Sequence, residues 1–123
     1  MGETLDAFAH VYRDEQGLKK AEATLAALRE RYREVGVQDP SEVFNTNLRD
    51  VLEIGSMLEL SQTVAAGALQ RKESRGSHAR VEYPTRDDAN FLKHTLTYRT
   101  EGLPRISSIP VARTRWEPME RKY

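Results

Sequence analysis

The segment "RKESRGSHARVEYPTRDD", residues 71 to 88, holds most of the side chains in this sequence that could make directional contacts. Half of its eighteen residues are charged, and it shows no obvious regular structure. Arginine presents a planar fork of donors to carboxylates and backbone carbonyls, and the glycine at position 76 permits a positive φ. We interpret this stretch as a salt-bridged, hydrogen-bonded docking segment. Its candidate contact residues are Glu73, Ser74, Arg75, Gly76, His78, Arg80 and Arg86.

Catalytic and cofactor sites are disfavoured by the same residues. The three histidines, His10, His78 and His94, have no paired-ligand spacing, so we expect no metal site. "SRGSH" has one glycine and no strand–loop–helix context, which disfavours a phosphate cradle. Ser74 or Ser77 beside His78 could suggest a nucleophile, but sequence adjacency does not place an imidazole on a hydroxyl. We therefore predict no catalytic residue, no cofactor-binding residue and no metal ligand in this chain.

A nucleic-acid interface is the remaining reading of the segment. Its basic residues are Arg71, Lys72, Arg75, Arg80 and Arg86. The acidic residues that interleave with them are Glu73, Glu82, Asp87 and Asp88. Because a phosphate-binding face does not usually dilute its charge in this way, we predict no nucleic-acid partner.

Composition places the chain among globular domains. Its 123 residues fit one domain, with 38% hydrophobic and 31% charged residues and a formal net charge of zero. It has no cysteine, which excludes disulfides and thiolate metal sites within this chain. The first residues lack a secretory-signal pattern, and no apolar run is long enough to span a bilayer. We expect this piece to be soluble, with no direct membrane insertion.

A first long helix is predicted for residues 14 to 35. Asp14 can cap its start and Gly36 can stop it. One apolar stripe runs through Leu18, Ala21, Leu25, Leu28, Tyr32 and Val35. The opposite face should be solvated and carries Lys19, Lys20, Arg29 and Arg31.

A second, antiparallel helix is predicted from "DPSE" to about Arg71, with Asp39 as N-cap, Pro40 in the first helical position and Glu42 in the third. It carries two apolar stripes, which indicates burial on two sides. One stripe is Leu48, Val51, Leu52, Gly55, Leu58, Ala65 and Leu69. The other is Ile54, Met57, Leu60, Val64 and Ala68. Gly55 costs about 1 kcal/mol in a helix interior, so we expect close packing or a bend there.

The rest of the chain is predicted to be shorter elements. Residues 86 to 96 suggest a short helix that begins near Asp87 or Asp88, followed by strands and a hairpin through "TEGLPR". The fold class is therefore mainly α: an antiparallel helical bundle, made of a long helical hairpin plus a short third helix, with a C-terminal extended or β-hairpin tail. We divide the single domain 1–123 into a helical hairpin (1–72), a polar docking segment with the short helix (73–98) and an extended tail (99–123), of which the last residues, "MERKY", are polar and could fray.

The sequence resembles the C-terminal domain of the succinate dehydrogenase and fumarate reductase flavoprotein subunits. The resemblance covers nearly the whole chain, including "LRERY" (28–32), "FNTNLRDVLEIGSMLELSQTVAAGAL" (44–69), "RKESRGSHARVEYPTRDDANFLKHTL" (71–96) and the end "ERKY". Within the third stretch it runs through Glu73, Ser74, Arg75, Gly76, His78, Arg80, Pro84, Arg86, Asp87, Asp88, His94 and Thr95.

This resemblance implies a parent oxidoreductase that oxidises succinate to fumarate, or the reverse, through FAD. The family's catalytic and flavin-binding motifs lie in other domains and are missing here, so the isolated chain is expected to be inactive and to hold no cofactor. The implied partners are the flavin-binding domain of the same subunit and the iron–sulfur subunit, in a complex at the cytoplasmic face of the membrane. The seven candidate residues would then serve that docking, and the second apolar stripe of the second helix, or its neighbour, would be buried against the missing surface.

Three alternatives stay open. The same domain of an L-aspartate oxidase shares an "SRG…H" segment, although the longer match favours succinate dehydrogenase. A stand-alone helical module could bind another protein through its exposed stripe. A small arginine-cluster RNA binder would lose affinity steeply with salt.

Overall fold

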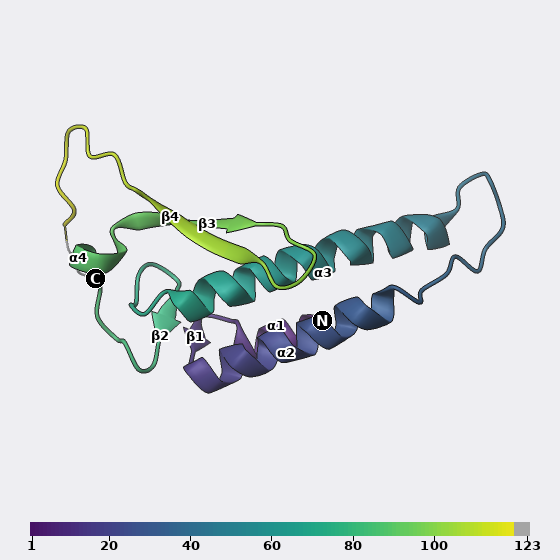
Figure 1. The fold of residues 1–123 in the computed structure, drawn as a ribbon, viewed down its shortest axis with the longest axis horizontal. Coiled ribbons are helices and arrows are strands. Elements are labelled where there is room, and N and C mark those ends of the chain that lie inside the picture. The colour runs from purple at the N-terminus through teal and green to yellow at the C-terminus, as the bar shows by residue number, and fades with distance from the viewer. Residues whose placement is uncertain (120–123) are drawn as a thin grey trace.

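The computed structural model describes residues 1–119 and shows a pair of long antiparallel helices with a β-hairpin laid along one of them (Figure 1). This arrangement confirms the mainly helical fold class with a C-terminal hairpin. In chain order the elements are α1 (Gly2–Phe8), β1 (Tyr12–Arg13), α2 (Glu15–Tyr32), α3 (Thr46–Gln70), β2 (Ala79–Arg80), α4 (Asp88–Phe91), β3 (Lys93–Tyr98) and β4 (Arg105–Pro110).

The start of α2 is confirmed, and its end comes earlier than predicted. Asp14 caps the helix by accepting a hydrogen bond of 2.7 Å from the backbone N–H of Gly17. The helix ends at Tyr32 instead of running to position 35, because the following residues form tighter turns, such as the bond from the Val35 N–H to the Tyr32 carbonyl. Gly36 therefore lies in the loop and does not end the helix.

The predicted start of α3 is wrong. The helix begins at Thr46, with Asn45 as its N-cap, and not at Asp39 or Pro40. The Asn45 side chain accepts a bond from the Leu48 N–H at 2.8 Å and donates to the Asp39 carbonyl at 2.8 Å. Because this amide both accepts and donates, it caps the helix and holds the preceding residues as a loop.

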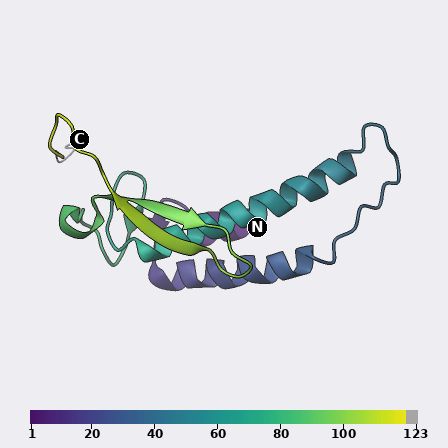
Figure 2. The same cartoon turned by 45° about the horizontal axis from the view of Figure 1, so that its top comes forward.

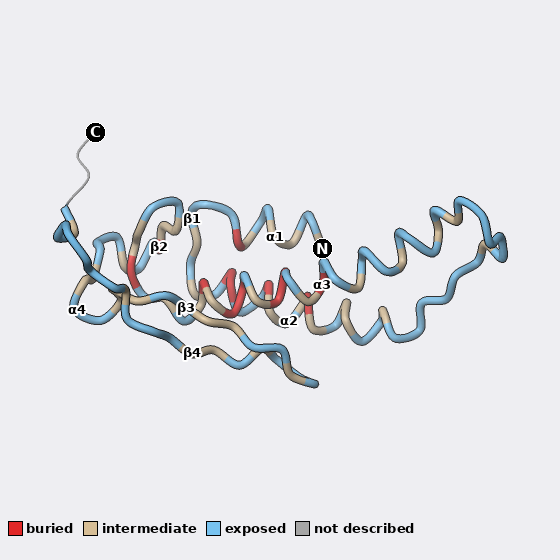
Figure 3. Tube along the Cα trace, turned by 90° about the horizontal axis from the view of Figure 1, so that it is seen from above, coloured by how far each residue is buried: buried red, intermediate tan, exposed pale blue. Residues whose placement is uncertain are grey.

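The core lies between α2 and α3, with α1 across one side. Its two clusters of buried residues are Ala9, Leu18 and Ala68, and Ala21, Leu25 and Ala65. Figure 3 shows that the buried residues gather where α1, α2 and α3 meet, while the far end of the helix pair is exposed. The core is therefore concentrated at one end of a long molecule.

Gly55 allows the close helix approach that the sequence predicted. A Cβ atom at this position would lie 2.5 Å from the hydroxyl oxygen of Tyr32. That hydroxyl donates to the Val51 carbonyl on α3 at 2.9 Å. The aromatic ring from α2 thus occupies the space above Gly55.

The hairpin β3–β4 is confirmed, with a register that runs from Lys93 opposite Pro110 to Tyr98 opposite Arg105. In Figures 2 and 3 it lies along α3, on a different side of the helix pair from α1. Its turn is held by Arg29, which donates to the Gly102 carbonyl at 2.7 Å and the Thr100 carbonyl at 3.3 Å. Arg29 is therefore not a solvated residue, contrary to the sequence prediction, because its long side chain crosses to the hairpin.

The short helix is shorter than predicted, and the terminal motif lies partly outside the described residues. The short helix α4 is a single turn capped by Asp87, shorter than residues 86 to 96, because Lys93 already pairs in β3. Of the terminal motif, residues 120–123 lie outside the described part of the chain. No helix within residues 1–119 is both long and apolar enough to cross a membrane.

Candidate docking site

The charged segment is organised around Glu73, whose side chain is fully buried. Its carboxylate accepts two bonds from Arg75, both at 2.9 Å, one from the backbone N–H of Asp87 at 2.9 Å and one from Arg71. Burial acts to raise the pKa of Glu73, but the donors from Arg75, Asp87 and Arg71 outweigh it, so the pKa lies below its ordinary value. Glu73 is thus held ionised at the centre of a salt-bridged cluster.

Arg75 and Arg86 extend this cluster toward the surface through Asp88. Arg75 reaches one carboxylate oxygen of Asp88 at 2.6 Å, and Arg86 reaches the other at 2.9 Å. The hydrogen bond to Glu73 is the main reason that the pKa of Arg75 is raised. Arg86 also donates to the Met119 carbonyl at 2.8 Å, so it attaches the C-terminal tail to the cluster.

Arg80 is the largest fully buried side chain among the described residues, and it closes the C-terminal end of α3. Its guanidinium donates to the carbonyls of Ala68 and Leu69, each at 3.1 Å, which have no partner within the helix. The second terminal nitrogen of Arg80 is buried and has no hydrogen-bond partner in residues 1–119. Arg80 therefore supports α3 from inside the domain.

Ser74 and Gly76 shape the backbone around Arg80. The Ser74 hydroxyl accepts from the Arg80 N–H at 2.8 Å and donates to the Tyr83 carbonyl at 2.7 Å. Gly76 has φ of +60°, within the tight turn that pairs Arg75 with His78. A Cβ at Gly76 would meet no atom within 4 Å, so the positive φ and not crowding explains the glycine.

His78 joins this segment to the N-terminal residues. Its Nδ1 lies 2.8 Å from an Arg13 nitrogen and its Nε2 lies 3.0 Å from the Arg71 carbonyl. Because arginine can only donate and a carbonyl can only accept, the ring is neutral, with its proton on Nε2. Burial, followed by the nearby charges of Arg13, Arg80 and Arg71, lowers the pKa of His78. This contact lies beside the parallel β1–β2 pair, in which Arg13 is opposite Arg80.

The seven predicted residues are thus brought together: Arg75 bonds to Glu73 and Ser74 to Arg80, and Arg86 joins them through Asp88. Glu73 and Arg80 are buried and shape the segment, whereas Gly76 and Arg86 remain exposed. Docking by these residues stays a prediction. The sequence reading missed Arg13, since nothing in the local pattern of residues 10 to 15 indicates a partner 65 residues away.

A second candidate surface is formed by the apolar stripe of α3. Ile54, Met57, Leu60 and Val64 are between 46% and 64% exposed, whereas Ala68 is buried beneath α1. We call these four exposed residues the open face. Because exposed apolar patches often mark interaction sites, the open face is a candidate binding surface.

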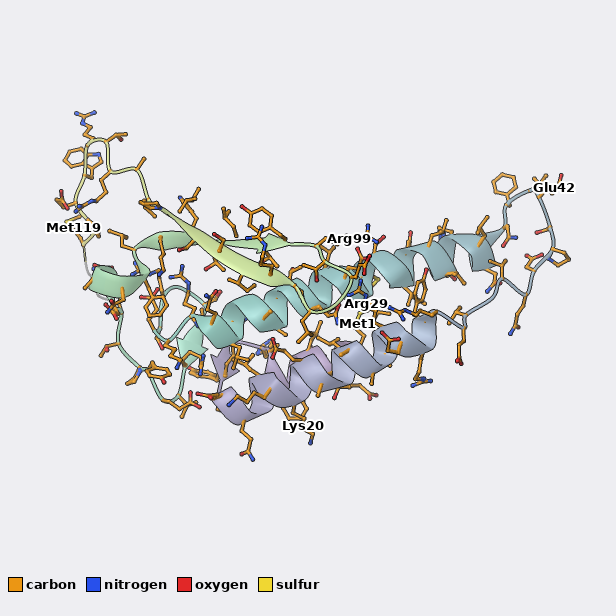
Figure 4. All side chains as sticks on the ribbon, viewed as in Figure 1. Met1, Lys20, Arg29, Glu42, Arg99 and Met119 are labelled. Carbon is orange, nitrogen blue, oxygen red and sulfur yellow. The ribbon has the colours of Figure 1, made fainter. Side chains whose placement is uncertain are left out.

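A cavity of about 380 Å³ lies beside the open face, between α3 and the turn of the hairpin. Leu60 and Thr63 line it from α3, and Thr97 and Pro104 line it from the hairpin side. Figure 4 shows Arg29 and Arg99 at this turn, and Arg99 pairs with Glu59 of α3 at 2.8 Å. The cavity continues the open face and offers space for a side chain from a partner.

Within residues 1–119, no three His, Asp or Glu residues gather in a group that could hold a metal ion. His10 and His78 both contact Arg13, which donates to the His10 carbonyl and lies 2.8 Å from the His78 Nδ1, whereas His94 lies opposite Ile109 in the hairpin.

The whole of this chain is similar to one protein family. All of residues 1–123 match the family described as the fumarate reductase flavoprotein C-terminal region. The chain belongs to this family. The fumarate reductase flavoprotein subunit of Haemophilus influenzae is 44% identical over 124 residues, which covers 100% of this chain and 21% of that protein.

Solved structures of the family share the fold. A quinol fumarate reductase of Escherichia coli superposes with a TM-score of 0.92 at 38% identity, over 97% of this chain and 21% of that chain. The succinate dehydrogenase flavoprotein subunit of Coxiella burnetii is 43% identical, but over 72% of this chain. The sequence analysis favoured succinate dehydrogenase. The match to the Haemophilus fumarate reductase covers the whole of this chain, whereas the match to the Coxiella succinate dehydrogenase does not. The chain is therefore more similar to the fumarate reductases. It spans about a fifth of the length of the relatives it matches.

Proposed function

We propose that this chain is the C-terminal helical domain of a fumarate reductase flavoprotein subunit, and that it docks onto the rest of that subunit through the open face of α3. The observation that carries the proposal is the match over the whole chain to proteins of which it covers 21%. In the proposed parent, FAD held by another domain would exchange a hydride with fumarate or succinate. The complex would lie at the cytoplasmic face of a membrane, with an iron–sulfur subunit as partner.

The residues of this chain do not fit a flavin site. The turn at Gly76 is closed by bonds between Arg75 and His78 and does not precede a helix, so it lacks the geometry of a pyrophosphate-binding loop. The arginines near it are engaged by Glu73 and Asp88. We therefore place FAD in the remainder of the parent, and assign no step of the reaction to this chain.

Burial of the open face would release enough free energy to hold the domain against the rest of the subunit. Full burial of an aliphatic side chain contributes about 1.5–3 kcal/mol, so the half that each of Ile54, Met57, Leu60 and Val64 still exposes leaves about 1 kcal/mol apiece. About 4 kcal/mol in total is enough to keep one domain against another in the same polypeptide, because linkage removes most of the entropy cost of association.

The first test is the size of the native polypeptide. An antibody against this 14.1 kDa chain should detect a band several times larger in the source cells, together with flavin and membranes. A band near 14 kDa would instead favour a free-standing helical module that binds another protein.

The docking role is tested in the full-length subunit with Val64→Asp, which places a charge on the open face. We expect loss of bound flavin and aggregation, because the carboxylate would be buried at the domain junction. Ala23→Asp is the matched control, since Ala23 is exposed on α2 away from this face. Equal behaviour of the two variants would refute docking through Val64.

A further inference from the structure

The tip of the α2–α3 loop presents an aromatic residue in an unusual backbone conformation. Phe44 is 96% exposed, and it is the one residue other than glycine within 1–119 that has a positive φ, at 52°. A bulky side chain rarely adopts this conformation, because its Cβ crowds the following carbonyl. Both features are unfavourable for the free domain, and neither contributes to its core.

The loop is fixed in this conformation by the side chains of Asn45, the N-cap of α3, and Asn47 in its first turn. The Asn45 amide donates to the carbonyls of Asp39 and Ser41 at 2.8 and 2.9 Å, and Asn47 accepts from the Gln38 N–H at 2.8 Å. Phe44 is therefore presented by a tied loop. A ring presented in this way loses little conformational entropy when it binds, as interface anchor residues require.

Phe44 belongs to an apolar ridge at the tip of the helix pair. The ridge consists of Val43, Phe44 and Leu48, all of them exposed, and we call it the tip ridge. Leu52 is left out, because it lines one pocket with Met57 and Leu60 of the open face. Leu48 and Met57 are nine residues apart, which is two and a half helical turns, so they lie on opposite sides of α3. A surface that covers the open face at Met57 does not also cover Leu48.

The surroundings of the tip ridge are acidic. Residues 39 to 53 contain four carboxylates, Asp39, Glu42, Asp50 and Glu53, against the single cation Arg49. Arg49 is already paired with Asp50 at 2.7 Å. A complementary partner would therefore have an apolar pocket with a rim of lysine or arginine.

We propose that the tip ridge binds a separate polypeptide of the complex, with Phe44 inserted into an apolar pocket that has a basic rim. The inference rests on the proposed function, because it assigns the open face to the rest of the same subunit. The loop also lies at the end of the molecule opposite the C-terminal tail, as Figure 1 shows, so the tip can reach a second polypeptide while α3 packs along its own subunit.

Photo-crosslinking identifies the occupant directly. Phe44→p-benzoylphenylalanine in the full-length subunit, irradiated within the purified complex, should give an adduct with a separate polypeptide on a denaturing gel. The same replacement at Lys19, on the exposed face of α2, serves as the control and should give none. An adduct within the flavoprotein chain, an adduct with a second copy of it, or no adduct at Phe44 would overturn the proposal.

Affinity measurements separate binding from folding. Phe44→Gly accepts the positive φ, so the full-length subunit should keep its flavin and its thermal midpoint while its dissociation constant for the other subunits rises at least about 30-fold. Tyr12→Ala removes a ring that is 80% exposed at the other end of α2 and should leave affinity unchanged. Unaltered affinity of Phe44→Gly would overturn the proposal. Failure of the proposed function is distinguishable, since it shows as a native band near 14 kDa.

Discussion

Gly55→Ala should change the stability of this chain in opposite directions depending on what stands at position 32. With Tyr32 present, the new methyl group would lie 2.5 Å from the hydroxyl oxygen and 2.7 Å from the ring carbon that bears it. The ring must move, and its hydrogen bond to the Val51 carbonyl is then lost. The substitution is therefore unfavourable in the natural background.

The magnitude follows from three opposing contributions. Overpacking of this kind costs about 1–3 kcal/mol, and the lost hydrogen bond about 1 kcal/mol. Alanine is better than glycine in a helix interior by about 1 kcal/mol, which offsets part of the loss. We expect Gly55→Ala to lower the free energy of unfolding by about 1–3 kcal/mol. In a Tyr32→Ala background the clash is absent, and the same substitution should raise it by about 1 kcal/mol.

Urea unfolding of the four proteins, followed by circular dichroism, measures this double-mutant cycle. Tyr32→Phe is a useful intermediate, because it removes the hydroxyl but keeps the ring carbon that lies 2.7 Å away. A destabilising effect of Gly55→Ala that stays the same without the Tyr32 ring would refute the explanation, and would mean that Gly55 is needed for a helix bend instead.

Three further substitutions test the caps and the charged cluster, each by urea unfolding. Asn45→Ala should cost about 1–2 kcal/mol, and Asp39→Ala clearly less, because Asn45 caps α3; the reverse order would restore Asp39 as the cap. Glu73→Gln should cost about 3 kcal/mol, since it removes the buried counter-charge of two partly buried arginines, Arg71 and Arg75; a loss below 1 kcal/mol would contradict that role. The pKa of His78 is lowered in the folded state, so the unfolded chain binds more protons and the free energy of unfolding should fall as the pH drops below about 6.5. His78→Gln should remove this pH dependence. A pH dependence that stays the same in the variant would mean that other groups cause it.

The helix pair and the hairpin could be predicted because their signals are local and repeated. Asp14, the apolar stripe of α2 and the alternation around the 99–104 turn each specify one structure. Gly55 was predictable as a point of close approach, though not its partner Tyr32. The start of α3 was not, because Asp39 and Asn45 are both good caps and only the loop bonds of Asn45 decide between them.

The charged segment shows a different limit of sequence reasoning. Its density of arginines and carboxylates predicted a salt-bridged segment, which the structure has, but composition does not tell whether a side chain points into the domain or out of it. Arg80 points inward because the free carbonyls at the end of α3 need donors, and Glu73 because two arginines and a backbone N–H surround it. Both facts depend on elements meeting in space, as does the contact between Arg13 and His78.

The positions of these side chains indicate which surfaces could contribute free energy to docking. The guanidinium and carboxylate groups of Arg75, Glu73 and Asp88 already satisfy one another, so exchanging them for contacts with a partner would gain little net free energy. The apolar side chains of the open face and of the tip ridge are still in contact with water, so their burial would be a net gain. We therefore expect substitutions on these two apolar surfaces to weaken assembly directly. Substitutions in the charged cluster should weaken it only through the loss of stability that urea unfolding detects.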